Sequence, residues 1–126
     1  MSPSLTVIVV TLNRPDCVRR CLECLESQAP PADQIIVVDA SSDDRTRAVV
    51  AEFDGVVYLR NDKGFGRMTA SRNIGLQRAT GDIVAFIDDD AFVHPGWLAE
   101  LLEPYGDSKV GAVGGRALNN QPDEEK

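Results

Sequence analysis

The sequence contains no long apolar run and no signal-peptide pattern. A membrane-spanning helix needs about 20 consecutive apolar residues, and no segment of the 126 residues approaches that length. The first residues also lack the basic and apolar regions of a secretory leader. We therefore expect a cytoplasmic protein with no membrane span in this chain. Action at the inner face of the membrane, within a full-length parent, is the alternative.

Basic residues are also scarce. The chain has 13 Lys and Arg residues against 20 Asp and Glu residues, which gives a formal net charge of −7. It has no basic run or stripe that could neutralise a phosphate backbone. We therefore expect no nucleic-acid partner.

Cysteine is rare and confined to one short segment, as Cys17, Cys21 and Cys24. The C-x3-C-x2-C spacing matches that of a radical-SAM iron–sulfur site. The same spacing places all three on one helical stripe beside Leu22. The iron–sulfur motif normally lies in a loop with an aromatic residue before its last cysteine, where this chain has Glu23. We expect reduced, metal-free thiols with a structural role.

What the sequence does contain is a regular alternation of apolar runs and helix-like segments. Its 43% hydrophobic and 26% charged residues are ordinary for a globular protein, and the length suits a single domain over residues 1–126. Strands are predicted over residues 5–10, 34–38, 56–60, 83–87 and 109–118. Helices are predicted over residues 16–28, from the 41–44 turn to about 53, 67–79 and 97–104.

Three local signals refine the helices. Pro15 stands where a first helical turn begins. Ser41 and Asp44 have the spacing of a capping box, which predicts that they start the second helix. Gly75 lies inside a helix, where it costs about 1 kcal/mol relative to alanine, so close packing against another element is expected there.

The alternation of strands and helices predicts an α/β fold. Its central sheet is mostly parallel and lies between two helical layers, as in Rossmann-like three-layer α/β/α sandwiches. Right-handed crossovers place every strand-to-helix loop at one edge of the sheet, where such sheets bind ligands. The polar loops at residues 11–14, 39–43 and 88–90 are therefore expected to converge.

The strand over residues 83–87 runs into three consecutive carboxylates, Asp88, Asp89 and Asp90. Their mutual repulsion requires a compensating positive charge. A divalent cation with oxygen ligands supplies it, and such a cation often also holds a phosphate. A solvated acidic turn is the alternative for this triplet.

Four segments together resemble one known family. They are VIVVTLNR at residues 7–14, IVVDASSD at 36–43, SRNIG at 71–75 and FIDDD at 86–90. Their order and spacing are similar to those of family 2 glycosyltransferases with the GT-A fold, and the resemblance runs from residue 5 to about 118. It implies the nucleotide-sugar-binding half of an enzyme that transfers a sugar to an acceptor hydroxyl with inversion. The implied donor is a UDP-linked sugar.

The resemblance implies roles for residues on the first two polar loops. Thr11 and Arg14 would lie beside the nucleotide, and Asn13 would shape their loop. Asp39 would accept a hydrogen bond from the base, typically from the imide N–H of uracil. Ser41 would cap the following helix, with a ligand contact as a secondary role.

The resemblance also implies roles near the phosphates. Arg72 would reach the base or the phosphates with its fixed fork of donors. Asp90 matches the metal ligand of the family, with Mg²⁺ or Mn²⁺ as the cofactor. Asp89 would contact the ribose, and Asp88 would support the loop or neighbouring basic groups.

The sequence departs from the family at its C-terminal end. Family 2 enzymes carry a carboxylate general base well beyond the metal motif, because inverting transfer must deprotonate the acceptor hydroxyl. Here a polar tail with Asp123, Glu124 and Glu125 follows, and we nominate none of them. We expect a truncated relative that binds donor, with an unknown catalytic base, an unknown acceptor and little transfer activity alone. A non-catalytic nucleotide-sugar-binding module is the alternative, and an uncovered sheet would favour homo-oligomers.

Two other α/β classes fit less well. A phospho-acceptor receiver domain needs an acidic pair after its first strand and an aspartate after its third, where this chain has Thr11-Leu12 and Asn61-Asp62. A nucleotidyltransferase needs a glycine-rich loop after the first strand, and none follows it here.

Overall fold

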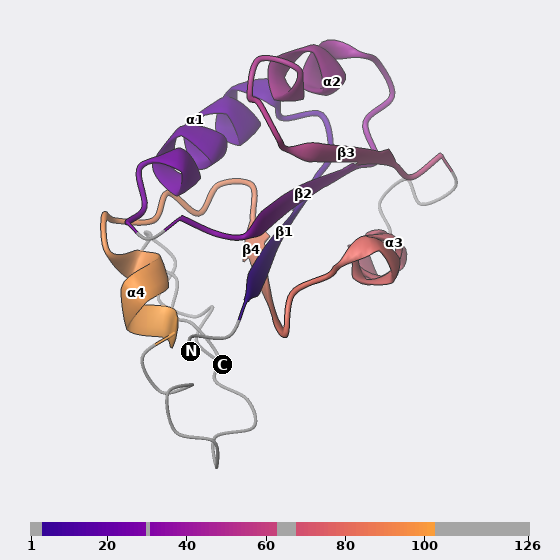
Figure 1. Ribbon diagram of the computed structural model, residues 1–126. Coiled ribbons are helices and arrows are strands. Elements are labelled where there is room, and N and C mark those ends of the chain that lie inside the picture. Colours follow the sequence, from indigo (N-terminus) through magenta and orange to yellow (C-terminus); the bar gives the residue numbers. More distant parts are fainter. Residues whose placement is uncertain (1–3, 30, 63–67, 103–126) are drawn as a thin grey trace, which may run out of the picture.

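The computed structural model describes residues 4–29, 31–62 and 68–102, and strands alternate with helices throughout that part of the chain (Figure 1). The strands are β1 (Leu5–Thr11), β2 (Gln34–Asp39), β3 (Val57–Arg60) and β4 (Ile83–Asp88). The helices are α1 (Pro15–Glu26), α2 (Arg45–Val50), α3 (Met68–Arg78) and α4 (Trp97–Leu102). Each strand lies within one residue of its predicted bounds. The strand predicted over residues 109–118 lies outside the described residues.

The four strands form one parallel sheet in the order β3-β2-β1-β4. β1 is fully buried and pairs on both sides. Its last residues align with the polar ends of both neighbours, Thr11 with Asp39 on β2 and Val10 with Asp88 on β4. The predicted parallel α/β sheet is confirmed.

Helices cover both faces of this sheet. α1 and α2 lie together on one face and α3 lies on the other (Figure 1). The chain adds β2 and β3 on one side of β1 and then returns to add β4 on the other side. With right-handed crossovers, this reversal places α3 opposite the first two helices. Open parallel sheets bind ligands outside the strand ends at such a reversal, which here lies between β1 and β4.

The core has two parts because successive strand residues point to opposite faces. On one face Val7 and Val9 of β1 pack with Leu22 of α1. On the other face Ile8 belongs to a smaller cluster to which Ile74 of α3 packs. The same alternation assigns the polar residues at the strand ends to one face or the other.

Gly75 of α3 shows the close packing that its place in a helix predicted. A Cβ atom added there would lie 2.8 Å from Cγ2 of Ile8 and 3.3 Å from Cγ2 of Val38. No side chain fits between α3 and the sheet at this point. The glycine therefore sets how closely the helix approaches β1 and β2.

The start of α2 differs from the prediction. The helix begins at Arg45, and Asp44 at its N-cap makes no side-chain capping hydrogen bond. The Ser41 hydroxyl instead accepts a hydrogen bond from the backbone N–H of Asn13, at 2.7 Å, and lies 3.4 Å from the Thr46 hydroxyl. The capping-box prediction is wrong because a second loop competes for the same hydroxyl. Ser41 ties loops together rather than starting a helix.

The cysteines of α1 are free thiols. Cys21 is buried in the core, and that burial raises the pKa of its thiol far above its ordinary value. Cys17 and Cys24 are partly exposed.

α1 itself begins at Pro15, as predicted, and ends two residues earlier than the predicted range. In the parts of the chain that the structure covers, no helix has the length and apolar character needed to cross a membrane.

Candidate functional site

The polar loops after β1, β2 and β3 are joined at the carboxyl edge of the sheet. The backbone N–H of Ala40 donates to the carbonyl of Thr11 at 3.0 Å. The N–H of Asn61, just after β3, donates to the carbonyl of Asp39 at 2.9 Å. These bonds continue the parallel ladder beyond the strands and fix the loops relative to one another.

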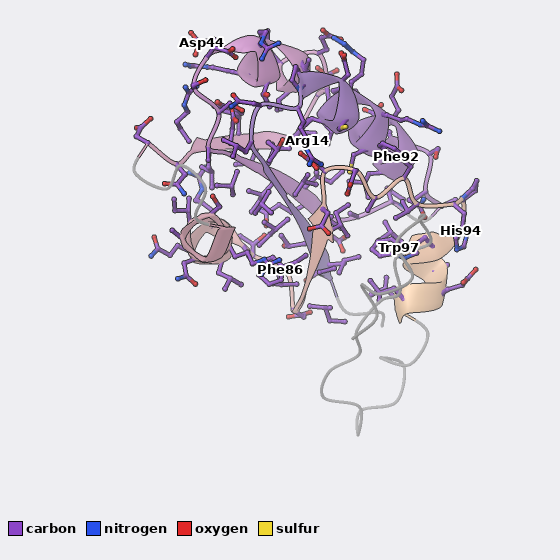
Figure 2. All side chains as sticks on the ribbon, turned by 180° about the vertical axis from the view of Figure 1, so that it is seen from behind. Arg14, Asp44, Phe86, Phe92, His94 and Trp97 are labelled. Atoms are coloured by element: carbon purple, nitrogen blue, oxygen red, sulfur yellow. The ribbon has the colours of Figure 1, made fainter. Side chains whose placement is uncertain are left out.

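Asp89 is the centre of a polar cluster between β1 and β4. Its side chain is buried, and both carboxylate oxygens have partners. The Thr11 hydroxyl donates to Oδ2 at 2.8 Å and Nη1 of Arg14 donates to Oδ1 at 3.1 Å. The same Arg14 nitrogen lies 3.5 Å from Oδ2 of Asp90. Figure 2 shows Arg14 where α1 approaches the segment that follows β4.

The charges of this cluster depend on one another. Burial raises the pKa of Asp89, while the hydrogen bond from Thr11 and the charge of Arg14 oppose that rise. The pKa of Arg14 is raised, chiefly by the charge of Asp89 and also by that of Asp90. Arg14 thus supplies positive charge to the acidic triplet. Its side chain is 54% exposed, so it can also reach a ligand at the rim.

Asn13 holds the loop that presents Arg14. Its φ of 55° lies in the left-handed region, which asparagine tolerates better than most residues. Its side-chain oxygen accepts hydrogen bonds from the backbone N–H of Ser42 at 3.1 Å and from the Ser42 hydroxyl at 3.3 Å. Together with the bond from the Asn13 N–H to Ser41, these contacts lock the loop after β1 to the loop after β2.

Asp39 is fully buried at the end of β2. Its Oδ1 accepts from the N–H of Ser41 at 2.8 Å, and its Oδ2 accepts from the hydroxyl of Tyr58 at 2.6 Å. Nη1 of Arg60 donates to the same Tyr58 oxygen at 3.2 Å, and Nη2 donates to the Ser41 carbonyl at 3.0 Å. The carboxylate is therefore held entirely by this chain's own groups.

Arg72 and Phe86 lie on the other face of the sheet. The Arg72 guanidinium is 5.8 Å from the centre of the Phe86 ring, a cation–π contact between α3 and β4. Phe86 is labelled on that side in Figure 2 and is 41% exposed. Asp88 shares the face of Phe86 by strand alternation. The structure thus brings Thr11, Arg14 and Asp89 together and places the Arg72 side chain away from them.

The acidic loop after β4 offers carboxylate oxygens that a divalent metal could use. In residues 4–29, 31–62 and 68–102, no group of three or more His, Cys, Asp or Glu residues is arranged to hold an ion. Mg²⁺, however, is commonly bound through one or two carboxylates, with substrate phosphates and water completing its shell. Asp90 has a partly exposed carboxylate at the rim. The residues present therefore fit a metal that arrives with a diphosphate.

Sequence reasoning missed Tyr58 and Arg60. Both side chains contact the Asp39 loop from β3, although they lie about twenty residues further along the chain. Strand register explains the contact: Arg60 aligns with Asp39, and Tyr58 aligns with Val37. The alternation of Tyr58 and Arg60 with Val57 and Leu59 was a usable signal, because it places both polar groups on the face of Asp39.

A parallel sheet with polar and acidic groups gathered at its point of reversal is typical of α/β proteins that bind phosphorylated ligands. The chain belongs to glycosyl transferase family 2, whose family model matches residues 6–126. It is 30% identical over 126 residues to the glycosyltransferase AglE of Haloferax volcanii, covering 95% of this chain and 41% of that protein. It is 34% identical over 122 residues to the glucosyl-dolichyl phosphate glucuronosyltransferase of the same organism, covering 94% and 39%.

The fold comparison agrees with the family. A mannosyltransferase from Pyrobaculum calidifontis, solved in complex with GDP-Man and Mn²⁺, superposes with a TM-score of 0.78 at 30% identity. The match covers 88% of this chain and 34% of that one. The recognised family and the GT-A-like fold are therefore confirmed. The chain spans about two fifths of the length of the two curated relatives.

Proposed function

We propose that this chain is the donor-binding part of a glycosyltransferase that moves a sugar from a nucleoside-diphosphate sugar to an acceptor hydroxyl, with inversion. The observation that carries the proposal is the cluster of Thr11, Arg14, Asp89 and Asp90 at the reversal between β1 and β4. Family membership supports the reaction class. The neighbour solved with GDP-Man and Mn²⁺ supports a nucleotide sugar as the ligand.

In this proposal Thr11 and Arg14 flank the nucleotide, with Asn13 fixing their loop. The buried Asp89 is oriented by Thr11 and Arg14 and accepts from the ribose hydroxyls. Arg14 also faces Asp90, so its charge attracts the diphosphate to the acidic loop. Arg72 reaches the base or phosphates only after leaving the Phe86 ring, and Asp88 supports the loop from the α3 side.

Asp90 is the proposed ligand of Mg²⁺ or Mn²⁺. The chemistry that such a metal would supply, bound with the diphosphate, is neutralisation of the negative charge on the departing nucleoside diphosphate. Arg14 would neutralise part of the same charge from the β1 side. Its guanidinium is protonated at neutral pH, and the charges of Asp89 and Asp90 raise its pKa further. No residue of this chain is proposed as the general base. The acceptor is unassigned, and a cytoplasmic location and a homo-oligomeric state stay predictions.

Asp39 is the proposed contact to the base, with Ser41 holding its loop. A carboxylate accepts from an N–H group and so favours a base that presents one. We propose uracil first, and guanine second because the solved neighbour carries GDP-Man. Both bases have a ring N–H on the pairing edge. A base without such an N–H would offer Asp39 no hydrogen-bond donor at that position.

Calorimetric titration with UDP, GDP and dTDP, each with Mn²⁺ and with EDTA, tests this function. We expect UDP to bind in Mn²⁺ and to bind at least several-fold more weakly in EDTA. Equal binding in EDTA would remove the metal from the proposal. Binding without transfer to any acceptor would favour a non-catalytic donor-binding module, which is the second candidate because the chain matches only part of each relative.

A further inference from the structure

The hydroxyl of Tyr58 occupies the oxygen of Asp39 that a base would otherwise use. Asp39 has no solvent-exposed surface. Its Oδ1 is taken by the backbone N–H of Ser41, an intra-loop bond that holds the turn after β2. Its Oδ2 is taken by Tyr58 at 2.6 Å, the short distance typical of an O–H donor on a carboxylate. A carboxylate oxygen can accept two hydrogen bonds, but Asp39 is completely buried, so a ligand can reach Oδ2 only if the phenol moves aside.

The direction of the Tyr58 hydrogen bond follows from its second partner. Arg60 donates to the phenol oxygen, and a guanidinium has no acceptor. The phenol proton must therefore point to Asp39. Arg60 is itself fixed by its bond to the Ser41 carbonyl and by Asp44, whose Oδ1 lies 3.2 Å from Nη1. Tyr58 thus presents a single donor, aimed at one oxygen.

The ring of Tyr58 is also held from α2. The guanidinium of Arg47 lies 5.7 Å from the centre of the ring, and the ring packs against the core beneath α1 and α2. The hydroxyl at the end of the ring reaches Asp39. Consistent with this placement, burial and then the bond to Asp39 raise the pKa of Tyr58 to about 12. The phenol is therefore protonated, and remains a donor, at neutral pH.

We propose that Tyr58 is a specificity-determining residue for the base: its hydroxyl is an internal donor that the base N–H must displace from Oδ2 of Asp39. This inference rests on the proposed contact between Asp39 and the base. A base with a ring N–H replaces one donor by another and leaves the carboxylate satisfied. A base without that group would break the Tyr58 bond and leave a buried carboxylate oxygen unpaired, which is costly. The displaced phenol keeps its bond from Arg60.

Removing the phenol oxygen tests the competition directly. Tyr58→Phe keeps the ring and frees Oδ2, so UDP no longer has to break a hydrogen bond. Since binding no longer has to break a hydrogen bond to a charged group, we expect UDP to bind about tenfold tighter, which corresponds to about 1.4 kcal/mol. The UDP analogue methylated at N3 lacks the donor, so its affinity should rise less. The preference for UDP over this analogue should therefore increase.

The control is the same change in an Asp39→Asn background. There the acceptor is no longer a carboxylate, and the gain from Tyr58→Phe should disappear. If guanine is the preferred base, GDP and its N1-methyl analogue replace the uridine pair. A purely structural Tyr58 predicts a different pattern: Tyr58→Phe would weaken the binding of UDP and of its methylated analogue equally, so the preference between them would not change.

A second measurement, fluorine NMR, follows Tyr58 during nucleotide binding without a substitution in the titrated protein. In protein labelled with 3-fluorotyrosine, the chain gives two fluorine signals, because it has two tyrosines, and Tyr58→Phe assigns them. Titrating UDP with Mg²⁺ should shift the Tyr58 signal as its hydroxyl leaves Asp39. The N3-methyl analogue should leave it in place.

The possible outcomes separate the inference from the function on which it rests. If UDP binds but the Tyr58 signal does not move, and Tyr58→Phe leaves the nucleotide preference unchanged, Tyr58 does not select the base, while donor binding stands. If neither UDP nor GDP binds the unmodified chain, the proposed function fails and this inference fails with it.

Discussion

At the scale of single residues, the site depends on residues that each form hydrogen bonds with two others. Asp89 accepts from Thr11 and Arg14, and Asn13 bonds to two neighbouring serines. Such shared bonds fix orientation, because moving one group disturbs two others. Substitutions here should therefore change binding or stability more than their exposure alone suggests.

Asp90→Asn should weaken the binding of UDP in Mn²⁺ by several-fold or more. The change keeps the size of the side chain and removes the charge that a divalent metal prefers. Titration calorimetry in Mn²⁺ and in EDTA measures the effect, which should be small in EDTA. Glu26→Gln, an exposed change at the last residue of α1, is the control. A loss of affinity equal in both conditions would assign Asp90 a role other than metal binding.

Asn13 separates backbone strain from hydrogen bonding. Asn13→Gly keeps access to the left-handed conformation and loses the bonds to Ser42, so it should lower the free energy of unfolding by about 1 kcal/mol. Asn13→Ala loses the same bonds and also strains the backbone at its φ of 55°, which adds about 1 kcal/mol. Urea denaturation of the two variants measures the difference. Equal stabilities would show that the loop adopts a negative φ in Asn13→Ala.

At the scale of elements, the apolar pattern predicts where strands lie more reliably than local sequence motifs predict hydrogen bonds. β1 and β2 could be predicted within one residue because β1 is fully buried and β2 is buried over its last four residues, and buried strands appear in the sequence as continuous apolar runs. The start of α2 could not be predicted, because the spacing of Ser41 and Asp44 does not show that Asn13 also bonds to the Ser41 hydroxyl. Tyr58 was missed for a related reason: its contact with Asp39 arises from the register between β2 and β3.

Gly75→Ala should destabilise the protein although alanine favours helices. The gain in helix propensity is about 1 kcal/mol. The added methyl would meet Ile8 at 2.8 Å and force α3 away from the sheet, and overpacking of this kind costs about 1–3 kcal/mol. We expect a net loss of up to about 2 kcal/mol in thermal or urea denaturation. Gln77→Ala, an exposed change in the same helix, should be neutral or slightly stabilising. A more stable Gly75→Ala variant would mean that α3 adjusts at no cost.

At the scale of the whole molecule, β1 organises everything else. Its pairing with β4 positions the acidic loop on one side, and its pairing with β2 positions the Asp39 loop on the other. β1 is also buried along its full length. The parallel order of the strands and the general place of the site followed from strand–helix alternation and the crossover rule. The placement of Arg72 on one face of the sheet and of Thr11, Arg14 and Asp89 on the other could not be predicted in this way. It depends on which strand residues face which helix.

Hydrogen exchange should therefore rank the strands by position in the sheet. Amides of β1 should exchange most slowly, because opening them requires breaking pairs with both β2 and β4. Amides of β3, which is shorter and pairs only with β2 in the described sheet, should exchange faster. Mass spectrometry of peptic fragments measures both. Equal protection of β1 and β3 would indicate that the sheet opens as a single cooperative unit.

The central place of β1 also sets the order in which the molecule can assemble. The Thr11–Asp89 hydrogen bond joins groups 78 residues apart, and long-range pairing of parallel strands is slow to form. On a ribosome adding about 5–20 residues per second, β1 waits about 4–16 s for its second neighbour. During that interval β2 can pair with it, while the acidic loop does not yet exist. The proposed donor site therefore forms only after β4 has paired with β1, and a chain stalled before β4 would expose one unpaired edge of β1 to aggregation.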